Sequence, residues 1–290
     1  MKYIFPNSVR SDFAGYNILT DFYHKTKGLS FREIIIDFRK TSWFEANLLA
    51  VLGAILHRIE HEFNKLAIVN LHSKVKTLFQ RNDFLSHFGG YKINDFYHTT
   101  IKYKRFKAEE EKLFTDYLDR ELLAKTTMPD MSNQLRKKIN ESIFEIFNNA
   151  VVHGTTKNIF TCGQYYPVKK KLDFTIVDLG VTIKRNVVGF LEKDLTGREA
   201  ISWSVKEGNT TRQGTIPGGL GLSLIREFLK INSGKIQIVS ADGYWEQVKD
   251  EMIRRDIVKE FPGTIVNLEF NINEESYYYL STEINEDEIF

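Results

Sequence analysis

Three stretches of the sequence carry residues whose types and spacing could bind a ligand. In the first, residues 132–153, four polar residues recur at every fourth position and therefore line up on one face of a helix: Glu141, Glu145, Asn149 and His153. A solvated polar helix face would explain this spacing by itself. Asparagine is a poor helix former, however, and two asparagines, Asn148 and Asn149, are adjacent within the stretch. A helix that keeps Asn149 one turn from Glu145 is suited to presenting both side chains to a ligand.

The second stretch, residues 172–183, is an apolar strand that ends in Asp178-Leu179-Gly180. An acid at a strand end, followed two residues later by glycine, allows a ligand to lie close to the backbone. A tight turn after the strand is the alternative interpretation.

The third stretch, residues 217–232, places Gly218, Gly219 and Gly221 before an amphipathic helix. Free backbone N–H groups at the positive end of a helix dipole suit phosphate binding. The Gly-Lys-Ser/Thr of a P-loop is absent, and the polar segment 206–216 stands where a dinucleotide fingerprint needs a hydrophobic strand. The glycines therefore indicate a phosphate loop of neither common kind, or a flexible turn.

The elements that must position these residues follow from periodicity. Residues 235–240 and 263–272 alternate as antiparallel strands would, and 244–261 between them is expected to be a loop with a short helix. In the first third of the chain, strand patterns at 31–38 and 66–71 alternate with helical patterns at 45–61 and 75–84. Alternating strands and helices predict an α/β layer there.

Taken in order, the second half resembles the GHKL family of ATP-binding domains, shared by histidine kinases, gyrases, Hsp90 and anti-sigma-factor kinases. Glu145 through Asn149 to His153 is similar to the N box of this family, and Asp178-Leu179-Gly180 to its G1 box. Gly219-Leu220-Gly221-Leu222 is similar to the G2 box, and Gly263-Thr264 to the closing Gly-Thr strand. The resemblance covers about residues 110–272. One departure is Thr182, which stands where the family often has a second glycine.

The resemblance implies ATP and Mg²⁺ as ligands. Asp178 would accept a hydrogen bond from the adenine amino group, Gly180 would leave room for the ring, and Thr264 would support Asp178 through its hydroxyl. Asn149 would be a ligand of Mg²⁺, which prefers oxygen. Glu145 would act as general base.

The glycine-rich stretch would wrap the phosphates through Gly218, Gly219, Leu220, Gly221 and Leu222. Residues 184–217 would form a lid over them. His153 would contact phosphate or, as an equal alternative, satisfy the last carbonyls of its helix.

The first third resembles a STAS-like domain over about residues 30–90. Glu45-Ala46 stands where phosphorylated members of that class carry an Asp-Ser pair. The expected fold is therefore an α/β (α+β sandwich) protein of two domains. Residues 1–105 would form the STAS-like domain, 106–272 a GHKL domain with a mixed sheet and helices on one face, and 273–290 an acidic tail.

Composition restricts the function classes. The 290 residues include 40 Lys+Arg and 38 Asp+Glu, and this balance excludes an electrostatically driven nucleic-acid binder as the default. The single cysteine, Cys162, excludes a disulfide framework and is expected to be a small buried hydrophobe. The N-terminus lacks an apolar signal region, and the longest apolar stretch, 46–56, is too short to cross a bilayer. A cytoplasmic protein without a membrane partner is expected.

Two functions remain open. The first is an ATPase or protein serine/threonine kinase that acts on a partner protein, with Glu145 as its catalytic residue. The second is a non-hydrolysing switch in which ATP controls which regulatory protein docks, with a homodimer left open. DNA-topology and mismatch-repair ATPases rank lower, because those proteins normally continue into a domain that supplies a catalytic lysine. Oxidoreductases lack the fingerprint that they would need.

Overall fold

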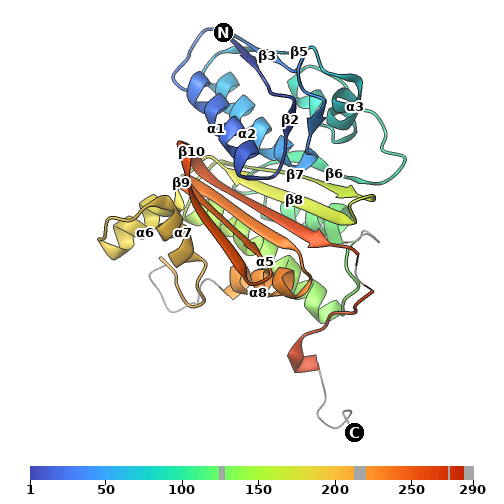
Figure 1. The fold of residues 1–290 in the computed structure, drawn as a ribbon, viewed down its shortest axis with the longest axis vertical. Helices are drawn as coiled ribbons and strands as arrows, with labels where there is room; N and C mark the ends of the chain where they lie inside the picture. The colour runs from blue at the N-terminus through green and yellow to red at the C-terminus, as the bar shows by residue number, and fades with distance from the viewer. Residues whose placement is uncertain (124–127, 212–219, 274, 284–290) are drawn as a thin grey trace.

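The computed structural model describes residues 1–123, 128–211, 220–273 and 275–283, without the side chains of Leu220 and Gly221 (Figure 1). It is a mixed α/β protein. Residues 1–99 are called the N-terminal unit below, and residues 100–283 the C-terminal unit. The two units are built around separate sheets that share no strand.

The N-terminal unit has a three-stranded parallel sheet in the order β1-β3-β5. The strands and helices expected from the sequence are confirmed: β3 (Glu33–Asp37), α2 (Leu49–His61), β5 (Lys65–Val69) and α3 (Ser73–Arg81). Sequence patterns did not reveal β1 (Lys2–Ile4) or α1 (Phe13–Thr26). The remaining elements are β2 (Ser8–Val9), β4 (Trp43–Phe44) and the short helices η1 (Ala46–Leu48) and η2 (Leu85–Phe88).

The C-terminal unit is built on a five-stranded sheet in the order β6-β7-β8-β10-β9. Its strands are β6 (Thr100–Lys107), β7 (Asn158–Tyr166), β8 (Lys171–Asp178), β9 (Lys235–Val248) and β10 (Glu251–Asn271). Every neighbouring pair is antiparallel, so the expected mixed sheet is wrong. The alternation of residues that predicts a strand does not specify the direction of its neighbour. The expected boundary near residue 105 falls inside β6.

Helices cover the lower face of this sheet in Figure 1. They are α4 (Glu111–Tyr117) with the π-helical turn η3 (Leu118–Leu123), α5 (Asn133–Val152) and α8 (Leu220–Ile231). The chain enters α5 at Ser132, whose hydroxyl accepts from the N–H of Leu135. The buried stripe of α5 has the three- and four-residue spacing of an amphipathic helix: Leu135, Ile139, Ile143, Ile146, Phe147 and Ala150. This packing fixes which side of α5 can face the sheet.

The opposite face of the sheet is covered by the N-terminal unit (Figure 1). One buried core joins α1 and α2 to the inward side chains of all five strands, including Tyr103, Phe160, Val177, Val239 and Ile265. Cys162 lies in the same core with no exposed surface, as expected, and burial raises the pKa of its thiol. The helices α4, α5 and α8 of the C-terminal unit thus lie on one face of the sheet, as expected of that domain, and α1 and α2 of the N-terminal unit pack on the other face.

A buried polar network crosses this interface. The amide nitrogen of Asn47, in η1, lies 2.7 Å from Ser11 Oγ, 3.0 Å from Thr175 Oγ1 and 3.0 Å from Asn267 Oδ1. Thr175 in turn donates to Asn267 Oδ1 over 2.7 Å. All four side chains are buried, so each hydrogen bond satisfies a group that water cannot reach. The N-terminal unit is thus bonded to the back of β8 and β10.

Residues 244–261 form a long hairpin between β9 and β10, so the expected loop with a short helix is wrong. The hairpin carries polar residues on strands that the hydrophobic pattern could not reveal. Its strands find partners on α1: Lys259 Nζ lies 2.6 Å from Asp21 Oδ1, and the N–H of Val258 donates to Asn17 Oδ1. These polar contacts add to the buried side chains of Tyr244, Ile257 and Phe261, which pack in the core shared with α1.

The segment expected to be an acidic tail is packed at its start. Tyr278 stacks edge-on against Phe228 of α8, with ring centroids 5.3 Å apart, and its carbonyl accepts from the N–H of Ser132. The short helix η4 (Ser281–Glu283) follows. Residues 284–290 lie outside the described part of the chain.

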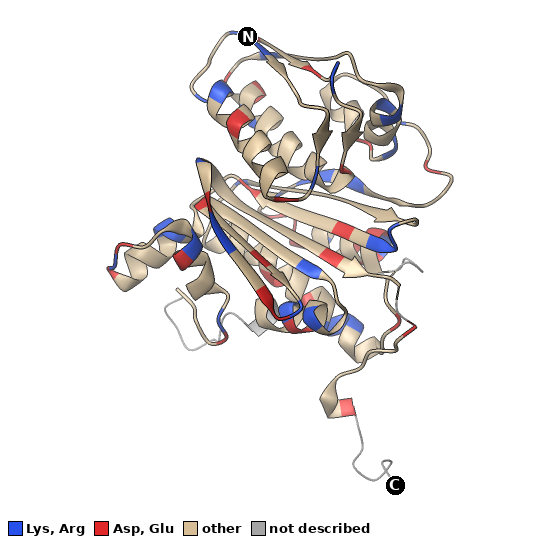
Figure 2. Ribbon diagram, viewed as in Figure 1, with Lys and Arg blue, Asp and Glu red and all other residues tan. Residues whose placement is uncertain are grey.

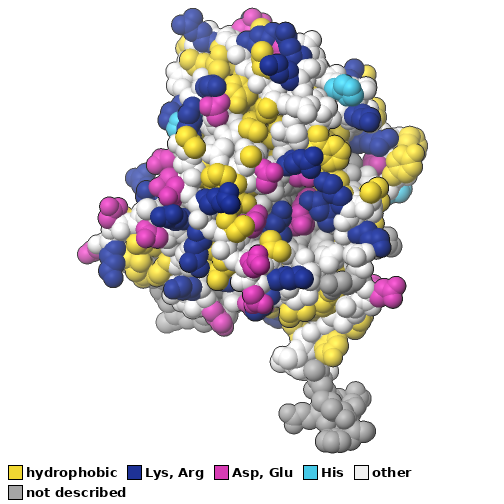
Figure 3. Space-filling view, in the orientation of Figure 1, with side chains coloured by type: hydrophobic (Ala, Val, Ile, Leu, Met, Phe, Trp, Pro, Cys, Tyr) yellow, Lys and Arg dark blue, Asp and Glu magenta, His cyan; other side chains and the backbone are white. Residues whose placement is uncertain are grey.

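Charged side chains of both signs are distributed over both units (Figure 2). On the face seen in Figure 3, apolar side chains form small areas separated by charged ones. Within the described residues, no helix combines the length and the apolar character that crossing a bilayer requires.

Candidate functional site

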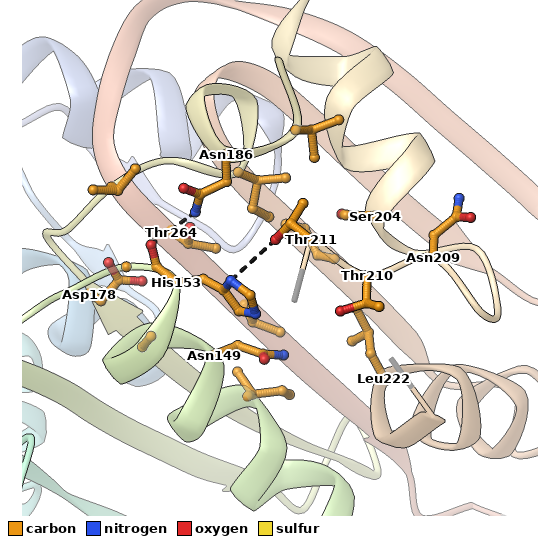
Figure 4. Close-up of a pocket in the computed structure, with 18 of the residues that line it drawn as sticks. Asn149, His153, Asp178, Asn186, Ser204, Asn209, Thr210, Thr211, Leu222 and Thr264 are labelled. Carbon is orange, nitrogen blue, oxygen red and sulfur yellow. Dashed lines mark hydrogen bonds between the residues drawn. The ribbon is translucent and has the colours of Figure 1, made fainter. Parts of the chain in front are cut away.

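A pocket lies between the C-terminal half of α5 and the ends of the central strands (Figure 4). Its remaining wall comes from α6 (Ile183–Leu191), α7 (Gly197–Ser204) and the start of α8. The apolar part of the lining is formed by Ile146, Ala150, Ile176, Val181, Val187, Leu222, Ile238 and Val266. A concave, mainly apolar site with a few polar groups is the usual form of a small-molecule pocket.

Asp178 is the buried acid of this pocket. It is the last residue of β8 and is 4% exposed. Its Oδ1 accepts from the N–H of Gly180 over 2.7 Å, and the backbone N–H of Thr264 also donates to the carboxyl. Burial nevertheless raises the pKa of Asp178 to about 7, because these two hydrogen bonds only partly offset the loss of hydration. The carboxyl is poised to accept a further donor from a ligand.

Gly180 has a structural reason to be glycine that differs from the expected one. The N–H of Val181 donates to the carbonyl of Gly154 over 2.6 Å, which brings the turn after β8 against the end of α5. A Cβ added at Gly180 would overlap that carbonyl oxygen. The close approach of two backbones is by itself sufficient to require glycine here.

Thr264 lies beside Asp178 as the sequence suggested, but through a different contact. The two residues are cross-strand partners in the β8–β10 ladder. The hydroxyl of Thr264 lies 3.2 Å from Ser240 Oγ on β9, while its backbone N–H serves Asp178. Ser240 in turn donates to the carbonyl of Gly263. The strand therefore supports Asp178 with its main chain.

Asn149 and His153 project from consecutive turns of α5 and line the pocket (Figure 4). Nδ1 of His153 lies 3.2 Å from the hydroxyl of Thr211, and its carbonyl accepts from the side-chain amide of Asn186. The backbone N–H of His153 donates to the carbonyl of Asn149. His153 thus joins the end of α5 to the segment expected to form a lid.

Glu145 does not line this pocket. It borders a separate shallow depression between α5 and α8, together with Glu141, Glu207 and Glu227. A shift of four residues moves a side chain about 6 Å along a helix, one turn away from Asn149. Helical spacing therefore predicts the shared face but not the shared cavity.

The glycine-rich stretch is described only in part. Gly218 and Gly219 lie outside the described residues. Leu220 and Gly221 form the first two residues of α8, and Leu222 lines the pocket. The first turn of α8 therefore borders the pocket, together with the end of α5 and the start of α6.

The expected lid, residues 184–217, contains two helices in its described part. Thr182 caps α6 by accepting from the N–H of Arg185, which gives this threonine a structural role at the start of the helix. A capping box between Thr196 and Glu199 begins α7. Gly197 then packs so closely on Gly243 of β9 that neither backbone leaves room for a side chain.

Several lining residues were missed by sequence reasoning. They come from the segment between β8 and α8: Asn186, Trp203, Ser204, Asn209, Thr210 and Thr211. No motif marks them, because their position depends on how α6 and α7 pack on β9. The polar run Asn209-Thr210-Thr211 after α7 was the one available signal.

A scan against protein-family models and a search of curated proteins found no match for the chain. Among the described residues, no three or more His, Cys, Asp and Glu side chains are grouped so that they could hold a metal ion.

Proposed function

We propose that the protein is a Mg-ATP-binding regulatory protein of the GHKL type, with the pocket between α5 and β8 as its nucleotide site. The observation that carries this proposal is the environment of Asp178. Its carboxyl is 4% exposed, and the hydrogen-bond partners found among the described residues are two backbone N–H groups. A buried acceptor of this kind favours a ligand that brings its own donor, such as the amino group of adenine.

The shape of the pocket supports a flat heterocyclic ligand. Branched apolar side chains line the cavity from both the helix and the sheet, including Ile146 of α5 and the cross-strand neighbours Ile176 and Val266. Trp203 adds an aromatic wall from α7. Such walls bind a ring through apolar contact, while the single acid selects its polar edge.

Phosphates and Mg²⁺ would lie toward α8. Its N-terminus offers backbone N–H groups and the positive end of a helix dipole, which favour anions. Asn149 lines the same pocket and would supply one neutral oxygen to Mg²⁺, which completes its shell with phosphate oxygens and water. The ion would neutralise charge on the phosphates. These residues fit a nucleotide-bound cation.

The position of Glu145 favours ATP as a bound signal over ATP as a substrate. A general base must reach the group that it deprotonates, and Glu145 borders the neighbouring depression instead of the pocket. A non-hydrolysing, ATP-gated switch is therefore the preferred form of the proposal. An ATPase or protein serine/threonine kinase that uses Glu145 is the second candidate, favoured by the retention of an acid one turn before Asn149.

We further propose a cytoplasmic regulatory partner protein and a STAS-like role for the N-terminal unit. The parallel three-stranded sheet β1-β3-β5, with helices between its strands along the chain, supports that role. The network around Asn47 supports a rigid connection between this unit and the strands that carry Asp178 and Thr264.

Calorimetric titration with MgATP tests the nucleotide site. Wild type should bind, and Asp178→Ala should weaken binding about 10- to 100-fold, as expected for loss of one hydrogen bond to a charged group. Asp116→Ala, at an exposed acid on α4 outside the pocket and the expected lid, should bind like wild type. No heat from wild type at millimolar MgATP, or equal affinity of wild type and Asp178→Ala, would refute the proposal.

Phosphate release distinguishes the two forms. The switch predicts MgATP binding without sustained release from purified wild type. Release that Glu145→Ala abolishes while binding persists would instead establish the enzyme.

A further inference from the structure

Two phenylalanine side chains of the N-terminal unit project into solvent and stack on each other. Phe31 is 80% exposed and Phe63 is 71% exposed. Their ring centroids lie 5.4 Å apart and their planes differ by 4°, which is a parallel offset stack. They precede β3 and β5, which are neighbours in the parallel sheet. We call these two side chains the phenylalanine patch.

Both residues have a backbone conformation that phenylalanine rarely adopts. Their φ angles are 56° and 62°, in the left-handed region where a bulky side chain is strained and glycine or asparagine is preferred. Strain that persists at exposed residues is commonly associated with function, since stability alone would favour its removal. The sequence keeps two large rings where the backbone favours small residues.

The turns are held by a buried neighbour and not by the rings. Asn64 accepts from the N–H of Arg32 over 3.0 Å, and its amide donates to the carbonyls of Leu29 and Ile59 over 2.6 and 3.0 Å. These bonds fix the loops on which Phe31 and Phe63 stand. The rings therefore form a pre-organised surface that costs little further entropy on binding.

The area of the patch matches the centre of an interface. An aromatic side chain buries about 150–250 Å², so the exposed fractions leave roughly 300 Å² of apolar surface at one place. A stable interface needs about 800 Å² per partner, with a few aromatic anchors near its centre. The patch supplies such anchors, and the residues around it would supply the rim.

The charges around the patch favour a second copy of this chain. Exposed cations and acids alternate there: Arg32 adjoins Phe31, and Glu33 is the cross-strand partner of Lys65. A two-fold axis can place the cation of one copy opposite the acid of the other, whereas a partner of one sign would meet like charges. The N-terminal unit and the pocket lie on opposite faces of the five-stranded sheet, so this contact leaves the pocket open (Figure 1).

We propose that the protein forms a two-fold homodimer through the phenylalanine patch, in which the stacked rings of one copy pack against those of the other. This inference is independent of the nucleotide proposal, because it uses no residue of the pocket.

Sedimentation analysis of full-length protein from 1 to 100 µM tests the dimer. Wild type should dimerise, and the double variant Phe31→Asn, Phe63→Asn should weaken dimerisation at least 100-fold while keeping the fold, because asparagine tolerates the left-handed region. Phe96→Asn is the matched control, since Phe96 is 79% exposed elsewhere and lacks a positive φ. It should dimerise like wild type. A monomeric wild type at 100 µM, or an unchanged dimer in the double variant, would overturn the proposal.

Disulfide trapping gives a second measurement that does not depend on the stability of the double variant. The native cysteine, Cys162, is fully buried, so it does not compete. Phe63→Cys should yield a covalent dimer under mild oxidation, and Phe96→Cys should not. Equal trapping at both positions, or none at Phe63→Cys, counts against a two-fold contact at the patch.

Discussion

Replacing Asp178 by asparagine should stabilise the protein, and the gain should grow with pH. Asparagine has nearly the same shape, and its carbonyl oxygen can still accept from the N–H groups of Gly180 and Thr264. It cannot ionise, so it removes the cost of burying a charge in the pocket. Asp178 would then contribute to nucleotide binding and at the same time reduce the stability of the folded protein.

The magnitude follows from the pKa of Asp178, which burial raises from 3.8 to about 7. Because the folded-state pKa is raised, the stability that the protonated carboxyl contributes is complete below about pH 4. It is lost as the pH rises through 7. One pKa unit corresponds to about 1.4 kcal/mol, so the loss is about 2 kcal/mol by pH 5 and about 4 kcal/mol above pH 7. The advantage of Asp178→Asn should therefore increase by about 2–3 kcal/mol between pH 5 and pH 8.

Urea unfolding at pH 5, 6, 7 and 8, followed by tryptophan fluorescence and circular dichroism, measures this difference. Other titrating groups occur in both proteins and cancel in the comparison. A difference in the free energy of unfolding that does not change with pH would refute the reasoning. An advantage that falls as the pH rises would show that Asp178 is a stabilised carboxylate in the folded protein.

Three further predictions concern the same structure. Gly180→Ala should lower the free energy of unfolding by about 1–3 kcal/mol in thermal or urea unfolding, because the added Cβ would overlap the carbonyl of Gly154. Gly189 lies in open space on α6, so Gly189→Ala should raise the free energy of unfolding by up to about 1 kcal/mol. Equal effects of the two substitutions would contradict the close backbone contact. Asn47→Ala should cost about 2–4 kcal/mol by leaving buried partners without a donor, and a loss below 0.5 kcal/mol would contradict the network across the interface. The affinity for MgATP should be about tenfold higher at pH 8 than at pH 6. The reason is that the carboxyl of Asp178, with a pKa near 7, must lose its proton before it accepts a hydrogen bond from the amino group. Calorimetry of Asp178→Asn should show no such dependence of the affinity on pH.

Much of the site's framework follows from local patterns. The apolar stripe of α5 and the alternation in β8 and β10 predict three elements that lie side by side. Asp178, Asn149, His153 and Thr264 consequently line one pocket. Each is placed by the periodicity of its own element, which a sequence records.

What the sequence could not predict depends on distant contacts. The closeness of Gly180 to Gly154 requires two segments 26 positions apart to meet, and no local pattern contains that information. Thr211 and Asn186 reach the pocket only because α6 and α7 fold back on β9. The packing of the N-terminal unit on the other face of the sheet likewise depends on α1, for which the sequence carries no strong motif.

Glu145 shows the limit of spacing as evidence. Its distance of four residues from Asn149 predicts a common helix face, and both residues do lie on α5. Ile146, the next residue along α5, does line the pocket, whereas Glu145 borders the depression between α5 and α8. The shape of a cavity is set by the elements opposite the helix, which the spacing does not describe.

The central claim is that Asp178 recognises the amino group of a purine nucleotide. The most direct test is to compare the affinity of wild type for MgATP with its affinity for magnesium inosine triphosphate, which has a carbonyl oxygen in place of that amino group. The account predicts at least tenfold tighter binding of ATP, and a much smaller preference in Asp178→Ala. Equal affinity of wild type for the two nucleotides would contradict it.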